Sequence, residues 1–436
     1  MTLTTVSLPQ APAGARPPAA RPRRTPTEPL PLCRYRPRAG HPDLARLHAE
    51  ALAIADEVRP RLVPPPGGLI EARRRARSYA TFAANYVENR RRARQGREDF
   101  LPLYFIWTLL RACNFTCTYC DDHRGRKYPE LPDEGRLDTA QGLELLRVMR
   151  TGSPSVYFAG GEPTMRRDLP ELTHAAFERG YFPIILNTNG SAIDRLLRLE
   201  SHRAWLGETD VIVVSLDALD LAHLAKLYAY RRPEDVIRNL LVLRELAEDH
   251  RVKLMVNTVI QPGRIGDARD VLDLVNDLGI WFCPVPMNAG PRIARGLGDD
   301  PEFRAFARLV LERKRQGCRI TGSARLNGRL LASAPLDCRN TLKPHVDHDG
   351  HLFWPCKASV NVEPERIRVL DYPDVRSLWA AASARVDPTR FHGPARNQCG
   401  ADCNWAQNYT TDAYAHGLAR PLSLVSEVLE LVQARA

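Results

Sequence analysis

The middle of the chain alternates between short apolar runs and segments with the apolar spacing of amphipathic helices. Strand-like apolar runs lie at residues 103–110, 155–159, 183–187, 211–216, 253–260 and 280–285. Helical spacing separates them, near residues 138–150, 168–180, 192–204, 233–249 and 265–278. Strands that alternate with helices form βαβ units around a parallel sheet. Six such units, rather than eight, predict an α/β fold with a partial (βα)6 TIM-like barrel.

The regions on either side of this core follow other patterns. Residues 1–40 are rich in proline, alanine and arginine, which predicts disorder. Apolar positions between 42 and 58, and again from 69 to about 95, fit two helices. The predicted divisions are a disordered basic arm at 1–40, a helical N-terminal extension at 41–100, the α/β core at 101–317, a small irregular domain at 318–415 and a C-terminal helix at 416–436.

Composition excludes some classes of protein. No stretch approaches 18 uninterrupted apolar residues, so no membrane partner is expected. The N-terminus lacks the apolar segment of a secretion signal. Ten cysteines in such a chain favour metal or redox chemistry over a disulfide framework, and that chemistry requires a reducing compartment. A cytoplasmic location is therefore expected.

Most of the net charge of +11 lies near the N-terminus. Residues 1–100 hold nineteen arginines, no lysine and nine acidic residues. Such an arm either meets an acidic partner or nucleic acid, or is a solvated leader of biased composition. The basic residues do not interleave with aromatic ones as base stacking requires, so nucleic acid is a disfavoured partner.

Three cysteines crowd into eight residues directly after the first predicted strand. Cys113, Cys117 and Cys120 are spaced C-x3-C-x2-C, which suits convergence on one metal centre better than pairing with one another. A 4Fe-4S cluster normally takes four cysteine thiolates, so three would leave one iron open for another ligand. The alternative is part of a zinc site, but zinc cysteines usually come as two pairs.

Polar and glycine-rich motifs follow the other predicted strands. In parallel α/β folds the active site lies at the carboxyl ends of the strands. Glycines in such a place allow a ligand to approach the backbone closely. In strand order the motifs are Gly160-Gly161-Glu162-Pro163, Thr188-Asn189-Gly190, Ser215-Leu216-Asp217, Asn257 within the fifth run and Pro286-Met287-Asn288.

The cysteine spacing and the order of these motifs resemble the radical S-adenosylmethionine (SAM) superfamily over about residues 101–290. The resemblance implies that Cys113, Cys117 and Cys120 hold a 4Fe-4S cluster whose open iron binds SAM. An electron from a reductant such as flavodoxin or ferredoxin would then release a 5′-deoxyadenosyl radical. The implied SAM contacts are Tyr119, Gly160, Gly161, Glu162, Pro163, Ser215 and Met287, and the implied substrate-pocket residues are Thr188 and Lys253.

A second set of cysteines lies beyond the core. Cys338, Cys356, Cys399 and Cys403 resemble the cysteine pattern of SPASM and twitch domains, which carry auxiliary iron–sulfur clusters. The resemblance implies one auxiliary 4Fe-4S cluster, because a full SPASM domain would hold more cysteines; a four-cysteine zinc site is the alternative. Cys33 is expected to have no role, and Cys283 is a candidate for the barrel interior. Cys318 is expected to be a buried thiol, with an extra metal ligand as the alternative.

The expected activity is hydrogen abstraction from a peptide or small molecule, leading to oxidation, cyclisation, epimerisation or cross-linking. Two alternatives remain. One is a non-catalytic iron–sulfur protein that transfers electrons or binds a partner. The other is an enzyme like the molybdopterin-precursor cyclase, which the core resembles. That family's own C-terminal cysteine spacing differs from this one, so GTP is not the favoured substrate.

Overall fold

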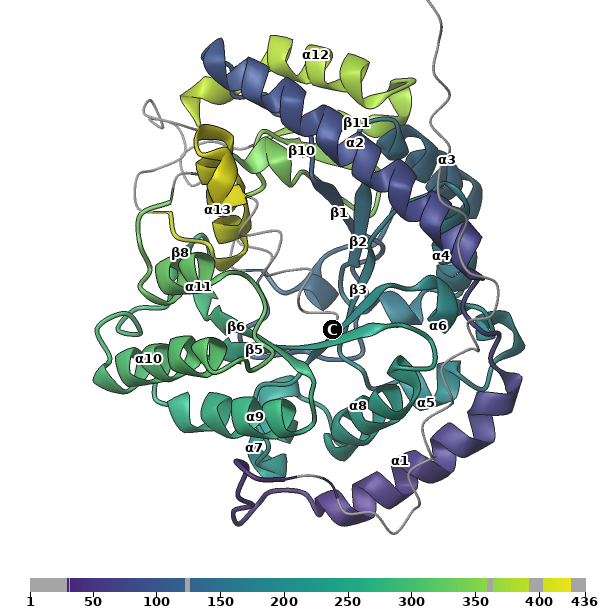
Figure 1. Cartoon of the computed structure of the whole chain (residues 1–436), viewed down its shortest axis with the longest axis vertical. Coiled ribbons are helices and arrows are strands. Elements are labelled where there is room, and N and C mark those ends of the chain that lie inside the picture. Colours follow the sequence, from purple (N-terminus) through teal and green to yellow (C-terminus); the bar gives the residue numbers. More distant parts are fainter. Residues whose placement is uncertain are drawn as a thin grey trace, which may run out of the picture.

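The computed structural model describes residues 30, 32–121, 126–336, 338–358, 364–391 and 403–424. Six parallel strands lie side by side in chain order, and the sheet stays open within the described ranges (Figure 1). The predicted α/β fold with a partial barrel is therefore confirmed. These strands are β1 (Tyr104–Thr108), β2 (Ser155–Ala159), β3 (Ile184–Thr188), β4 (Val211–Ser215), β5 (Lys253–Ile260) and β6 (Trp281–Pro286).

Helices connect consecutive strands and cover one face of the sheet. Their bounds are α3 (Thr139–Arg150), α4 (Leu169–Glu178), α5 (Ile193–Leu196), α6 (Trp205–Glu208), α7 (Leu221–Tyr228), α8 (Glu234–Ala247) and α9 (Ile265–Asp277). The sequence encodes their starts: Asp138 and Gln141 form a reciprocal capping box at α3, as the predicted helix start requires. In the described part of the chain, no helix combines the length and apolar character needed to cross a bilayer.

The segment predicted to be irregular instead extends the same sheet. Strand β9 (His345–Val346) pairs in parallel with β1, and β10 (His351–Trp354) and β11 (Glu365–Arg368) follow antiparallel beyond it. The free edge of β1 needs partners for its N–H groups, and Ile106 donates one to Pro344 O at 3.0 Å. These strands are too short for periodicity to reveal, so the prediction of an irregular domain is wrong here.

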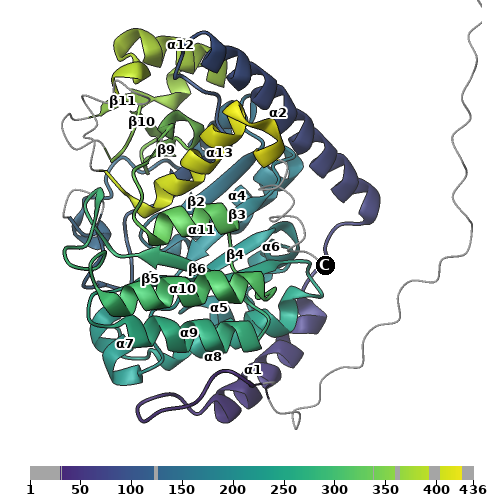
Figure 2. The ribbon, with the colours of Figure 1, turned by 60° about the vertical axis from the view of Figure 1, so that its left-hand side comes forward.

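A row of helices flanks the open side of the barrel. Contacts link α9 to α10, then to α11, α13 and α2, and Figure 2 shows α10, α11 and α13 stacked beside one another. The helices of the row that follow β6 in the chain are α10 (Pro301–Arg315), α11 (Ala324–Leu331) and α13 (Tyr409–Ala419). Outside the row, α12 (Val375–Arg385) contacts α3, and a hairpin of β7 (Asn288–Ala289) and β8 (Arg292–Ile293) follows β6. The predicted C-terminal helix at 416–436 falls largely outside the described residues.

The N-terminal extension contains α1 (Leu44–Val58) and α2 (Gly68–Arg94), where the sequence predicted helices. The buried face of α2 is polar. Ser78 donates its hydroxyl to Phe182 O at 2.6 Å, and Asn85 donates its amide to Pro102 O at 3.0 Å. Both acceptors lie just before strands of the barrel. The helix therefore supplies hydrogen-bond donors to the amino-terminal end of the sheet, opposite the cysteine loop.

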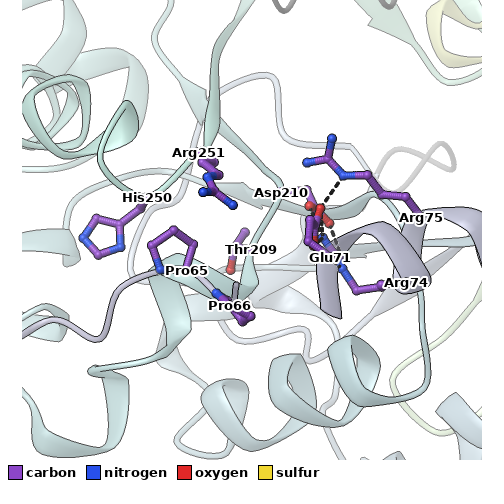
Figure 3. A pocket seen from close by; sticks show the side chains of 10 residues that line it. Pro65, Pro66, Glu71, Arg74, Arg75, Thr209, Asp210, His250 and Arg251 are labelled. Carbon is purple, nitrogen blue, oxygen red and sulfur yellow. Dashed lines mark hydrogen bonds and ion pairs between the residues drawn. The ribbon is translucent and has the colours of Figure 1, made fainter. Parts of the chain in front are cut away.

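Several arginines of this region hold the extension on the core. Arg74 is buried and donates to Asp210 Oδ2 at 2.9 Å and to Tyr181 O at 2.7 Å. Figure 3 shows Arg74 and Asp210 beside Glu71 in a small pocket. Arg92 is also buried, with Asp99. The expectation of a solvated or partner-binding basic region is thus wrong for these two arginines, whose charges are neutralised within the fold.

Residues 32–40 are also packed on the barrel, so the prediction of disorder to residue 40 is wrong at its end. The carboxylate of Asp277 accepts backbone N–H groups from Cys33, Arg34 and Tyr35 at 2.8, 2.7 and 2.9 Å. The Tyr35 side chain is buried. The rest of the predicted arm, residues 1–29 and 31, lies outside the described residues.

Replacing Asp277 with alanine should release this segment. The carboxylate has no exposed surface, and losing several hydrogen bonds to a charged group should lower the free energy of unfolding by about 1–3 kcal/mol. Trypsin should then cleave faster after Arg34, whereas the bond after Arg36 resists trypsin because Pro37 follows it. The matched control is Asp299→Ala, because the Asp299 side chain is almost fully exposed. Equal cleavage of both variants would contradict the anchoring role.

The stabilising effect of Asp277 should also depend on pH. Burial opposes ionisation of Asp277, but the hydrogen bonds from Cys33, Tyr35 and Arg34 prevail and lower its pKa. A carboxyl whose pKa is lower in the folded state stabilises the fold above its unfolded pKa of about 3.9. That contribution is lost as pH falls through the folded pKa. The stability difference between wild type and Asp277→Ala should therefore be constant above about pH 5 and shrink below pH 4, as measured by urea unfolding.

Candidate active site

The cysteine loop leaves the carboxyl end of β1 and is fastened to the end of α7. The backbone N–H groups of Thr116 and Thr118 donate to Tyr228 O at 3.1 Å and Leu227 O at 2.9 Å. The ring of Phe115 stacks on that of Tyr228, with ring centroids 5.1 Å apart. The loop is thus held against α7 by its non-cysteine residues.

The three thiols of this loop are partly exposed and unbridged. Burial raises the pKa of Cys113 to about 11 and raises that of Cys117 further. The charge of Cys120 raises the pKa of both thiols, and that of Cys113 raises the pKa of Cys117, so the three side chains lie within electrostatic range of one another. Gathered thiols that repel one another as thiolates fit a shared iron–sulfur centre, which would neutralise them.

The glycine motif packs directly on the cysteine loop. Gly161 N donates to Leu110 O, and Glu162 N donates to Ala112 O, both at 2.9 Å. A Cβ atom at Gly161 would overlap the carbonyl oxygens of Arg111 and Ala112, and one at Gly160 would overlap Leu110 O. Gly160 and Gly161 are therefore required for the segment after β2 to pack closely on residues 110–112, whether or not a ligand also approaches them.

Glu162 is buried, and its carboxylate is fully engaged within the protein. Oε1 accepts the hydroxyls of Thr164 and Thr188, each at 2.6 Å, and Oε2 accepts the N–H of Asn189 at 2.6 Å. Burial raises the pKa of Glu162, which these donors oppose. The side chain expected to contact SAM instead joins the end of β2 to the end of β3.

Thr188 does not face a substrate pocket, contrary to the expectation. Side chains alternate along β3, so Thr188 shares the buried face with Ile184 and Leu186. Its hydroxyl donates to Glu162 and accepts the N–H of Gly190 at 3.0 Å. Asn187, one residue earlier on β3, points to the opposite face. The sequence did not lead us to predict Asn187 as a site residue, although the alternation of side chains along a strand places it on that face.

A polar network connects the cysteine loop to the loop after β3. Asn189 Nδ2 donates to Asn114 Oδ1 at 2.8 Å and lies 3.9 Å from Cys113 Sγ. Asn114 in turn donates to the hydroxyl of Ser191 at 2.9 Å. The Thr-Asn-Gly motif therefore serves to orient the first cysteine of the loop.

The Tyr119 phenol, an implied SAM contact, donates its hydrogen to Asp217 Oδ2. The other oxygen of Asp217 accepts the N–H of Val259 at 2.7 Å. Burial raises the pKa of Asp217 to about 6. The hydroxyl of Tyr119 is thus committed to the protein, so any SAM contact at this position falls to its backbone or ring.

Ser215 is the last residue of β4, and Met287 directly follows β6. Ser215 is partly exposed and pairs in register with Asn257 of β5. Met287 is partly buried against the core, and its backbone is bonded to Ile260 and Ala294. Their roles toward SAM, like that of Pro163, stay predictions.

Lys253 lies at the other end of the barrel. It is the first residue of β5, paired with the first residue of β4, while the cysteine loop follows the last residue of β1. Its ammonium sits 4.1 Å over the ring of Trp281. Lys253 is therefore at the floor of the concave face rather than beside the thiols.

The concave face carries polar side chains between these two ends. Along β5 the residues facing α8 and α9 are buried, while the alternate residues, Asn257 among them, are partly exposed. Tyr104 and Tyr157 stack at 6.3 Å on the neighbouring strands. Cys283 pairs with Asn257, so it points into the same interior, as expected. The Oδ1 atom of Asn187 has no hydrogen-bond partner among the described residues.

The C-terminal cysteines form a second, buried group. Cys338, Cys356 and Cys403 are all buried. Burial raises the pKa of Cys338 and of Cys356, and the charge of Cys403 raises both further. Cys399 lies outside the described residues. Lys343 is within electrostatic range of all three thiols, and burial lowers its pKa to about 7 while they oppose the shift. Buried thiols around a lysine fit an anionic, thiolate-ligated centre.

Ion pairing ties the two cysteine groups together. Arg111, two residues before Cys113, pairs with Asp347 in the turn after β9. Nearby cationic groups and hydrogen bonds lower the pKa of Asp347 against the effect of burial. Because β9 also pairs with β1, both cysteine groups are built on one continuous sheet.

Together the open parallel sheet and the cysteine loop define an α/β protein with a thiol cluster at the carboxyl end of its strands. The family model described as the radical SAM superfamily matches residues 107–275, which run from within β1 into α9. That family performs SAM-dependent radical chemistry with a 4Fe-4S cluster.

Relatives and solved structures share parts of this chain. Fe-coproporphyrin III synthase of Methanosarcina barkeri is 29% identical over 226 residues, 48% of this chain and 51% of the relative. GTP 3′,8-cyclase of Mycobacterium marinum is 36% identical over 219 residues, which are 46% of this chain and 55% of the relative. The chain thus spans about half the length of these relatives. The crystal structure of Streptococcus suis SuiB bound to S-adenosylmethionine aligns with a TM-score of 0.48 at 17% identity, over 64% of this chain and 65% of that chain.

Adding one methyl group at Gly161 should disrupt the site. The Cβ atom of Gly161→Ala collides with backbone oxygens, so the cysteine loop must shift, at a cost of about 1–3 kcal/mol. Gly298→Ala is the control, since nothing lies within 4 Å of its Cβ position. After anaerobic reconstitution, iron content and melting temperature should fall for Gly161→Ala and not for Gly298→Ala. Normal iron loading of Gly161→Ala would contradict the packing role.

Proposed function

We propose that this chain is a radical SAM enzyme that abstracts hydrogen from a peptide or small molecule held in the barrel. The observation that carries the proposal is the gathering of Cys113, Cys117 and Cys120 at the carboxyl edge of an open, polar-lined sheet. When bound, the cluster supplies the electron that cleaves SAM and yields the 5′-deoxyadenosyl radical. A reductant of the flavodoxin or ferredoxin class would deliver that electron.

The chain's own residues then have distinct tasks. The three thiols hold the cluster. The SAM amino group is a hydrogen-bond donor and needs acceptors; Gly161 and Glu162 already use their N–H groups, which leaves backbone carbonyls of this motif for it. Glu162 fixes the motif against β3. Asn187 and Asn257 offer amide groups to the substrate from the concave face.

We further propose that Cys338, Cys356, Cys399 and Cys403 hold one auxiliary 4Fe-4S cluster. Four thiolates complete its coordination. Zinc would accept the same ligands, but the proximity of a radical SAM domain favours iron–sulfur. SPASM or twitch character of this segment rests on the cysteine pattern alone.

The alternatives are less well supported. The relative named GTP 3′,8-cyclase aligns over 46% of this chain. The sequence resemblance implies a different C-terminal cysteine spacing for that family, which disfavours GTP as substrate. A non-catalytic electron carrier has no use for a partly exposed polar interior beside the thiols, where Asn257 and Ser215 lie. An enzyme that abstracts hydrogen would use both the thiol cluster and the polar interior.

Loss of one core cysteine should abolish SAM cleavage. Anaerobically reconstituted wild-type protein with dithionite and SAM should release 5′-deoxyadenosine, and Cys117→Ala should release no more than protein without iron. Cys318→Ala, a cysteine remote from both groups in sequence, should match wild type. Release by Cys117→Ala at the wild-type rate would show that this loop does not hold the SAM-cleaving cluster.

Metal counting separates the two centres. Wild type should hold about eight irons per chain, and changing either the three core or the four C-terminal cysteines to alanine should leave about four. Iron, sulfide and zinc are measured on each reconstituted variant. One zinc and no iron in the core-cysteine triple variant would overturn the auxiliary cluster while leaving the SAM-cleaving cluster intact.

A further inference from the structure

The side-chain amide of Asn189, in the loop after β3, is held in one orientation. Its Oδ1 atom accepts the backbone N–H of Ser191 at 3.0 Å and the Ser191 hydroxyl at 2.8 Å. A backbone N–H can only donate, so the oxygen of the amide, and not its nitrogen, must face Ser191. The Nδ2 group of Asn189 therefore lies on the side of the cysteine loop.

This Nδ2 group carries two hydrogens, and the structure places an acceptor near each of them. Asn114 Oδ1 lies 2.8 Å from Nδ2, and Cys113 Sγ lies 3.9 Å from it. Asn114 is itself fixed, because its Nδ2 donates to the Ser191 hydroxyl at 2.9 Å. The side chains of Asn189, Asn114 and Ser191 thus form a closed ring of hydrogen bonds, which leaves one N–H of Asn189 for the sulfur of Cys113.

The surroundings of this N–H make it effective toward a charged sulfur. Asn189 is 9% exposed, so water competes little for its amide. Cys113 Sγ also accepts the backbone N–H of Phe115 at 3.3 Å. Hydrogen bonds to an ionised acceptor are stronger and shorter than those to a neutral one, so both donors gain when Cys113 becomes a thiolate.

We infer that Asn189 donates a hydrogen bond to the Cys113 thiolate and thereby raises the reduction potential of the SAM-cleaving cluster. This inference rests on the proposed function. Hydrogen bonds to the sulfurs are among the factors that set the potential of an iron–sulfur cluster. A donor beside a ligand sulfur favours the reduced form, because that form carries one more negative charge. Asn189 acts through Cys113, as a positioning residue that binds no iron.

Asn239 of α8 provides a matched control, because it supports the same loop from another side. It is fully buried, and its Nδ2 group donates to Gly190 O at 2.8 Å and to Asp194 Oδ1 at 3.3 Å. Asn239 and Asn189 thus share residue type, burial and a role in holding the loop after β3. Of these two amides, the one that faces a cysteine sulfur is that of Asn189.

The experiment is a redox titration of the anaerobically reconstituted full chain, followed by electron paramagnetic resonance. The signal of the SAM-cleaving cluster is the one that changes when SAM is added, because it has an iron open to SAM. Asn189→Ala should lower the reduced-to-oxidised ratio of this cluster at fixed potential at least about threefold, which is about half of the 59 mV that a tenfold change represents for one electron. Asn239→Ala should retain the wild-type potential.

Asn189→Asp provides a second measurement if the alanine variant does not hold the cluster. It keeps the oxygen that Ser191 bonds but replaces the N–H donor with a charged acceptor, so it should lower the ratio at least as far as Asn189→Ala. A wild-type potential in Asn189→Asp would contradict the inference.

The remaining outcomes also decide the matter. A wild-type potential in Asn189→Ala, or an equal shift in Asn239→Ala, overturns the inference and leaves the proposed function standing. Loss of the SAM-responsive signal from both Asn189 variants overturns it too, because the amide would then serve cluster assembly and not its potential. Absence of that signal from the wild type overturns the proposed function itself, and this inference with it.

Discussion

The buried carboxylate of Glu162 is the group on which the carboxyl end of the barrel depends. A buried carboxyl group needs hydrogen-bond partners, and here the donors come from Thr164, Thr188 and Asn189. The backbone N–H of the same residue donates to Ala112, one residue before the cysteine loop. The ends of three neighbouring strands are thereby fixed to one another, and the position of Cys113 follows from that connection.

The two cysteine groups share a sheet rather than occupying separate domains. Strand β9 lies along β1, and the turn that follows it pairs Asp347 with Arg111 beside the cysteine loop. Residues more than two hundred positions apart are thus held in fixed relation by backbone hydrogen bonds and one ion pair.

The arginine-rich extension serves stability at the opposite end of the barrel. Strands of an open barrel begin in loops whose carbonyl groups need donors, and α2 supplies them from Ser78, Asn85 and Arg74. This is why a helix with a polar buried face is stable on the protein. Part of the positive charge that marks residues 1–100 is accordingly neutralised by Asp210 and Asp99.

Local pattern alone determined the order of the strands, with bounds that agree to the residue at 155–159 and 253–260, and the position of the cysteine loop after β1. Periodicity suffices for this because it reports which residues are apolar along a short segment. It could not reveal that β9 completes an edge of β1, or that the Thr188 hydroxyl donates to Glu162. Those relations join residues far apart in the chain, and a polar side chain carries no local signal of its partner. Only the folded sheet, by bringing strand ends together, decides which charge each buried polar group meets.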